Sequence, residues 1–170
     1  MRTTLCLALI LTCIPLLSRG AEDELSAATQ PTAESWEQIA KDLGHAGELK
    51  DNVYTITLLR TDMEIRDEDG DIPAGLLKTE FQFYPCDCGK MNVAGQFCLF
   101  EYESDDVIDA LRAGRMKVVS VSPMFQGEHP RVTLVRFQGS AESSQIAKPL
   151  KDALKWTGEA RMAPATRPVE

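Results

Sequence analysis

The chain has 170 residues, of which 44% are hydrophobic and 26% are charged, a composition typical of globular proteins. This composition excludes a fibrous chain, a protein that spans a membrane many times and a wholly disordered chain. The formal net charge is −8. We therefore expect neither a nucleic-acid partner nor electrostatic binding to anionic lipid, because both need a basic face.

The first 20 residues have the three parts of a secretory signal peptide. Arg2 supplies a positive charge, an apolar run follows from Leu5 to Leu17, and Ser18 and Gly20 are small residues at positions −3 and −1 of a cleavage site. The apolar run is shorter than the ~20 residues that a spanning helix needs. We expect cleavage between Gly20 and Ala21, a secreted or periplasmic protein, and no membrane span.

The remaining chain divides into a leader, one domain and a tail. Residues 21–33 are small, polar and acidic, as in a flexible leader, and residues 158–170 contain two prolines and no apolar period, as in a disordered tail. Residues 34–157 lie between them and are numerous enough for one domain with its own core.

The domain begins with a predicted helix, between the candidate N-cap Thr32 and the stop residue Gly44. Its apolar residues recur at helical spacing: Trp36, Ile39, Ala40 and Leu43. Alternating residues rich in β-branched side chains predict the next elements. These are strands at 53–60, 62–66 (turning at 69–70), 79–84 and 92–102, with a turn at 87–90 between the last two.

Two further helices and two strands complete the prediction. Ser104 is expected to cap a helix that ends at Gly114, and strands follow at 116–121 and 131–138. A last helix is predicted over 141–156, kinked at Pro149. Short turns favour antiparallel pairing with the helices on one face. The sequence thus predicts an α+β two-layer sandwich, whose second half resembles part of a ferredoxin-like unit.

Three stretches of this domain resemble the LppY/LpqO family, a group of exported bacterial proteins of mostly unknown function. They lie at 36–44 (WEQIAKDLG), 53–62 (VYTITLLRTD) and 127–132 (GEHPRV). Members of that family carry a His-x-His pair and a further histidine in the following strand, a set suited to a metal ion. The resemblance places Ser122, Met124 and Arg136 at these positions. It therefore implies that any family metal site is lost here, and we expect no cofactor.

Three cysteines remain after signal cleavage: Cys86, Cys88 and Cys98. An odd number in an oxidising compartment leaves at least one thiol free or paired outside the chain. Thiolates can hold a soft metal or exchange disulfides, so the three are weak candidates for a metal site. The alternative is one ordinary disulfide and one buried or capped thiol. Because Cys98 lies far along the strand opposite Cys86, a bridge between these two is disfavoured.

The candidate binding residues are Glu128, His129 and Arg131, in the loop before the 131–138 strand. A Glu-His pair can perform acid–base chemistry, but the sequence contains no nucleophile elbow and no Gly-rich phosphate loop. We therefore favour a non-catalytic exported domain that binds an unidentified small molecule or envelope protein. The alternative is a metal-dependent or thiol-based envelope enzyme that uses the three cysteines and His129.

Overall fold

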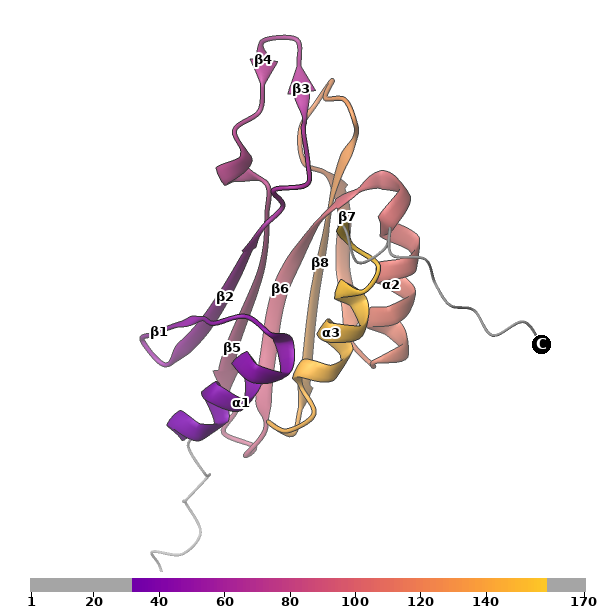
Figure 1. Ribbon diagram of the computed structural model, residues 1–170. Coiled ribbons are helices and arrows are strands. Elements are labelled where there is room, and N and C mark those ends of the chain that lie inside the picture. Colours follow the sequence, from indigo (N-terminus) through magenta and orange to yellow (C-terminus); the bar gives the residue numbers. More distant parts are fainter. Residues whose placement is uncertain (1–31, 159–170) are drawn as a thin grey trace, which may run out of the picture.

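The computed structural model describes residues 32–158, in which three α-helices cover one face of a six-stranded sheet (Figure 1). The helices are α1 (Ala33–Leu43), α2 (Ser104–Ala113) and α3 (Ala147–Leu154). The strands of this sheet are β1 (Glu48–Lys50), β2 (Val53–Leu59), β5 (Lys78–Pro85), β6 (Met91–Phe100), β7 (Lys117–Pro123) and β8 (Val132–Ala141). The predicted α+β class is confirmed.

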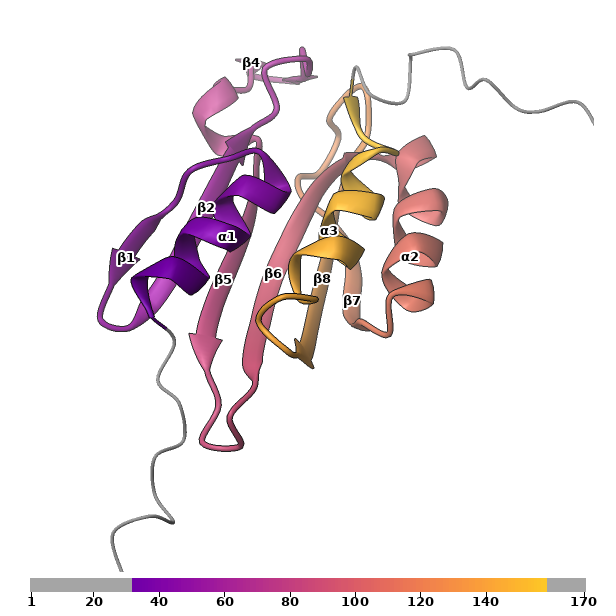
Figure 2. The same ribbon diagram turned by 60° about the horizontal axis from the view of Figure 1, so that its bottom comes forward.

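The strand order of the sheet is β1-β2-β5-β6-β8-β7, and all neighbouring strands are antiparallel. Because β8 is antiparallel to both β6 and β7, those two strands run parallel, and α2 connects them across the inserted β8. This is a split β-α-β arrangement, as the predicted ferredoxin-like second half requires. Figure 2 shows α1, α3 and α2 side by side on the same face of the sheet.

The main core lies between the helices and this face of the sheet. Phe81, Phe97 and Phe137 meet there with ring centroids 5.1–5.8 Å apart. Helix α1 contributes Trp36, which stacks on Tyr54 at 5.5 Å. As predicted, α1 starts after Thr32 and ends at Gly44, which has the left-handed φ of 76° that favours glycine.

A second, smaller core lies at one end of the opposite face. It contains Met63, Ile65, Leu77, Cys98 and Val132. The two neighbours of Cys98 on β6 face the helices. Because successive side chains of a strand point to opposite faces, the Cys98 side chain points away from the helices. Residues 61–77 cover it and include a two-stranded ribbon, β3 (Arg66–Asp67) with β4 (Gly70–Asp71), and a 3-10 helix, η1 (Ala74–Leu76).

Four details differ from the prediction. The strand expected at 62–66 is wrong, because Met63 and Ile65 are buried in the second core as irregular chain, and pairing begins only at Arg66. The short exposed strand β1 was not predicted, since its three residues carry no apolar alternation. Ser104 is the first residue of α2 and makes no capping hydrogen bond from its side chain to the helix N-terminus, where Glu103 is the N-cap.

The fourth difference concerns the last helix. Strand β8 continues to Ala141, and α3 begins at Ala147 rather than 141. Pro149 is therefore the third residue of α3, in the first turn, where backbone N–H groups have no intrahelical acceptor. The carbonyl of Gln145, whose clash with Pro149 was expected to kink the helix, lies before α3, so the reason for expecting a kink within the helix no longer applies.

The predicted signal peptide and most of the predicted leader and tail, at 1–31 and 159–170, lie outside the described residues. Within residues 32–158, no helix is long and apolar enough to cross a membrane.

Candidate functional site

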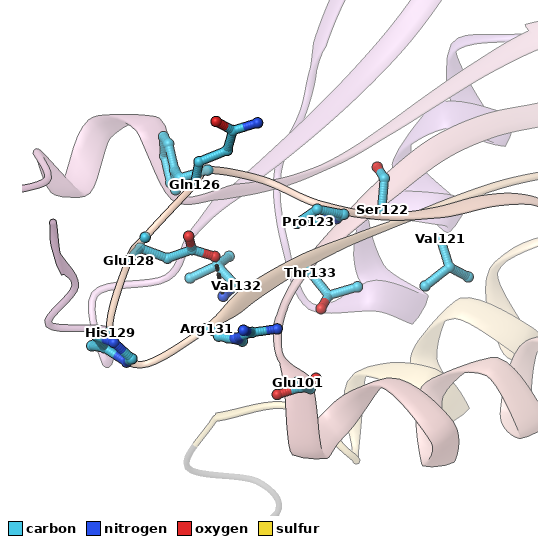
Figure 3. Close-up of a pocket in the computed structure, with 12 residues that line it drawn as sticks. Glu101, Val121, Ser122, Pro123, Gln126, Glu128, His129, Arg131, Val132 and Thr133 are labelled. Atoms are coloured by element: carbon cyan, nitrogen blue, oxygen red, sulfur yellow. Dashed lines mark hydrogen bonds between the residues drawn. The ribbon is translucent and has the colours of Figure 1, made fainter.

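A cavity of about 410 Å³ opens where β7 ends and β8 begins. Figure 3 shows its walls, which come from the end of β7, the 124–131 loop, the start of β8, and Glu101 in the 3-10 helix η2 (Glu101–Glu103). Its polar lining residues are Glu101, Ser122, Gln126, Glu128, His129, Arg131 and Thr133. The three predicted binding residues thus line one pocket, which we call the loop pocket.

Backbone contacts fix the loop that carries these residues. The N–H of Met124 donates to the carbonyl of Val132 at 2.8 Å, which closes the loop at its base. At the tip, Arg66 and His129 exchange two backbone hydrogen bonds of 2.7 and 3.0 Å, which attach the loop to β3. Gly127 reverses the chain with a φ of 78°, in the left-handed region that glycine adopts without strain. Backbone hydrogen bonds therefore hold the loop at its base and at its tip.

Glu128 is the most buried charged residue of the loop pocket, with 4% of its surface exposed. Its Oε1 accepts the backbone N–H of Val132 at 3.2 Å, and Figure 3 shows the carboxylate directed inward from the loop. Within residues 32–158 no hydrogen bond reaches Oε2, and no Lys, Arg or His forms an ion pair with this carboxylate. Among the described residues no fully buried side-chain oxygen lacks a hydrogen-bond partner, so Oε2 reaches the open space of the cavity and is available to a ligand.

The other charged groups of the pocket are exposed and are likewise unpaired among the described residues. Glu101, His129 and Arg131 make no side-chain ion pair within 4 Å there. Figure 3 shows Arg131 extending toward the space beside Thr133 and Glu101. The pocket therefore offers one guanidinium and two carboxylates that are not already neutralised by each other.

Glu101 was missed by sequence reasoning. It lies 30 positions before Arg131, yet its backbone N–H donates to the carbonyl of Arg131 at 3.2 Å. The contact depends on the register of β6 and β8, which pairs Phe100 with Val132. No local pattern around Glu101 carries that information, so only a correct strand pairing would have placed it in the pocket.

Ser122, Met124 and Arg136, the positions at which the LppY/LpqO resemblance led us to expect substituted histidines, lie on the face of the sheet opposite the helices. Ser122 lines the loop pocket and pairs with Leu134, two residues from Arg136 on β8. Met124 packs in the second core, where its Sδ lies 3.8 Å from the Sγ of Cys98. Arg136 is exposed. One face thus carries all three side chains, which offer a hydroxyl, a thioether and a guanidinium.

The cysteines are not brought together. Cys86 and Cys88 form a disulfide in the turn between β5 and β6, and Cys98 is a buried free thiol. Cys98 lies seven positions along β6 from Met91, which follows the turn, a span of about 23 Å at strand spacing. Burial raises the pKa of the Cys98 thiol to about 11. Within the described part of the chain, no group of three His, Cys, Asp or Glu side chains is placed to hold a metal ion.

Comparison with known proteins identifies a family. No curated protein and no solved structure matches the chain. Residues 37–156, nearly all of the folded part, match the family described as Domain of Unknown Function (DUF1259). The chain therefore belongs to the DUF1259 family.

Proposed function

We propose that this domain is an exported, non-catalytic module that binds a small zwitterionic molecule in the loop pocket. The observation that carries the proposal is Glu128, a carboxylate that is 4% exposed, lines the cavity and keeps one oxygen without a partner among residues 32–158. An ammonium group at that oxygen would supply the missing charge and a hydrogen bond. Glu128 is thus the anchor for the positive end of the ligand.

Arg131 would bind a negatively charged group at the other end of the ligand. A guanidinium presents N–H donors in a planar fork that matches a carboxylate, and the Arg131 side chain has no ion-pair partner in the described chain. The volume of about 410 Å³ falls within the roughly 300–1,000 Å³ of small-molecule sites. An α-amino acid has both charges and is small enough to fit within this volume.

The export part of the proposal rests on residues 1–20, and the finer family assignment rests on the three stretches that resemble LppY/LpqO proteins. We propose that the chain is a divergent LppY/LpqO-type member, since Ser122, Met124 and Arg136 replace the three histidines. Intact mass of the protein recovered from its own host tests export. A mature chain that starts at Ala21 supports it, whereas a diacylglycerol on Cys13 overturns cleavage at that site.

Calorimetric titration tests ligand binding. The probes are a panel of α-amino acids, an alkylamine of matched size and an alkyl carboxylate of matched size. We expect saturable heat with at least one amino acid, and at least tenfold weaker binding of both single-charge probes. Equal affinity for the carboxylate alone, or no binding by any amino acid, would overturn the zwitterionic assignment.

Two variants assign the charges to their residues. Glu128→Gln should weaken amino-acid binding at least tenfold, which corresponds to about 1.4 kcal/mol. Arg131→Gln, at an exposed position that should not affect folding, should weaken it by a similar factor. Glu142→Gln is the matched control, since it removes an exposed carboxylate just beyond the other end of β8. If both pocket variants bind as tightly as the control, the ligand does not occupy this pocket.

A further inference from the structure

The Cys86–Cys88 disulfide lies at the opposite end of β6 from the loop pocket, in the exposed turn between β5 and β6. Figure 2 shows this turn projecting beyond the end of the sheet. Cys88 is exposed and Cys86 is half-buried, with a single residue between them. Exposed disulfides belong to the labile, exchangeable class more often than buried ones do.

The turn is held by backbone hydrogen bonds that do not involve the sulfur atoms. The N–H of Cys86 donates to the carbonyl of Lys90 at 2.8 Å, and the N–H of Gly89 donates to the carbonyl of Cys86 at 3.0 Å. Directly below, Pro85 pairs with Met91 at the end of the strand ladder. A disulfide across so few residues closes a very short loop and restricts the unfolded chain little. Opening it therefore requires no rearrangement of the sheet.

One contact distinguishes the two sulfur atoms. The backbone N–H of Cys88 points at the Sγ of Cys86, 3.1 Å away. A hydrogen bond to a sulfur atom favours its charged thiolate form over the thiol. Cys86 is accordingly the better leaving group of the pair, while the exposed Cys88 is the more accessible target.

We infer that Cys86 and Cys88 form a reversible thiol–disulfide exchange site for a small-molecule thiol of the glutathione class. The incoming thiolate attacks the Sγ of Cys88, a new S–S bond forms, and the Cys86–Cys88 bond breaks with its electron pair on Cys86. A second thiolate then attacks the sulfur of the small molecule and releases Cys88. Overall, one protein disulfide and two small-molecule thiols give one protein dithiol and one small-molecule disulfide. The two thiols supply the two electrons and two protons.

Cys98 takes no part in this exchange. It is buried in the second core against Met124, about 23 Å along β6 from the turn. The inference therefore involves two cysteines rather than the three of the alternative envelope enzyme, and it is independent of ligand binding in the loop pocket.

Equilibration of the full chain with mixtures of reduced and oxidised glutathione tests the site. Acid quenching, thiol labelling and peptide-resolved mass spectrometry then report each cysteine separately. We expect Cys86 and Cys88 to become labelled together as the share of reduced glutathione rises, at the same midpoint from either direction. Cys98 is a free thiol at the start, so its labelling should be the same in every mixture, and the far-ultraviolet circular dichroism should not change. A pair that stays oxidised in reduced glutathione alone, or a domain that unfolds on reduction, would overturn the inference.

Variants test the direction of attack. With Cys86→Ser, oxidised glutathione should form a mixed disulfide on Cys88 that persists, because no neighbouring thiol can displace it. With Cys88→Ser, the half-buried Cys86 should form its adduct at least tenfold more slowly. Equal rates in the two variants would overturn the assignment of Cys88 as the more accessible sulfur atom. Cys98→Ser is the matched control and should leave the midpoint of the pair unchanged.

Discussion

The guanidinium of Arg60 and the carboxylate of Glu103 form a two-pronged ion pair in the interior, with Nη1–Oε2 at 2.9 Å and Nη2–Oε1 at 3.0 Å. Their side chains are only 7% and 1% exposed. Glu103 also accepts the backbone N–H groups of Phe100 and Gly158. The pair therefore ties the end of β2 to the end of β6 and to the chain that follows α3.

Arg60 has further partners in this network. It donates to both carboxylate oxygens of Asp62 and to the carbonyl of Cys98. Burial lowers the pKa of Arg60, but the hydrogen bonds and charges of Asp62 and Glu103 raise it by more, so the net direction is upward. Arg60 is therefore positively charged at every pH at which the domain is folded.

Replacement of Glu103 by alanine should strongly destabilise the domain. The change leaves a buried guanidinium without its more buried carboxylate partner and removes the acceptor for two backbone N–H groups. Breaking a buried ion pair in this way typically costs about 3–5 kcal/mol. Urea denaturation followed by circular dichroism measures the loss.

Asp152→Ala is the control for this variant. Asp152 binds Lys148 and Lys155 at 2.5 and 2.6 Å, but all three side chains lie at the surface. Exposed ion pairs contribute roughly 0–1 kcal/mol. Similar losses in the two variants would show that the buried network adds nothing beyond surface pairing.

Stability should fall in acid as Asp62 takes up a proton. The hydrogen bonds from Arg60 lower the pKa of Asp62, against the smaller opposing effect of burial. A carboxyl group with a lowered folded pKa contributes stability above its unfolded pKa, near 3.9, and loses it as pH falls through the folded value. We expect the free energy of unfolding to decrease below about pH 4.

Asp62→Asn isolates this contribution. The variant should be less stable than the parent at neutral pH, and the difference should shrink as pH is lowered toward 2. Thermal unfolding between pH 2 and pH 7 measures both curves. Parallel curves for parent and variant would mean that Asp62 titrates identically in the folded and unfolded chains.

Trp36→Ala should melt far below the parent. Trp36 is 5% exposed and stacks on Tyr54, so it fastens α1 to the sheet. Truncation of a buried aromatic residue typically costs about 3–5 kcal/mol of the roughly 5–15 kcal/mol that stabilise a domain. Trp156→Ala is the matched control, since Trp156 is 43% exposed. Thermal unfolding that is lowered more by the Trp156 change would contradict the assigned core.

The sequence predicts those elements whose residues repeat at a regular spacing. Helix α1 was predicted with both ends, because one apolar stripe lies between Thr32 and Gly44. Strand β1 carries no such alternation, and its place is set by pairing with β2 across a turn in which Asp51 and Asn52 have positive φ. Regular elements with a buried stripe are predictable, whereas short edge elements depend on their neighbours.

The same distinction applies to the site. Glu128, His129 and Arg131 are nearly contiguous, so one loop carries them and local reading was sufficient to group them. Glu101 joins them only through the pairing of β6 with β8. The contact between Arg60 and Glu103 spans 43 positions, and no periodicity within either segment indicates it. Long-range contacts of this kind follow from the register of the sheet.

That register also explains why a glycine occupies position 95. Phe81 on β5 and Phe137 on β8 both pair with Gly95 of β6, so two aromatic rings flank a residue without a side chain. A Cβ atom at this position would lie 2.5 Å from the carbonyl oxygen of Glu80 and 3.0 Å from the ring of Phe137. The close atom of Glu80 belongs to the backbone and cannot turn away, so the ladder between β5 and β6 must shift.

Gly95→Ala should therefore destabilise the domain by about 1–3 kcal/mol, the usual cost of overpacking a filled core. Gly75→Ala is its control, because a Cβ atom there meets no atom within 4 Å. The control should stay within about 0.5 kcal/mol of the parent or be slightly more stable, since alanine restricts the unfolded chain. Urea denaturation of the two variants decides between them. If Gly95→Ala is as stable as Gly75→Ala, the β5–β6–β8 register described for this core is wrong at its centre.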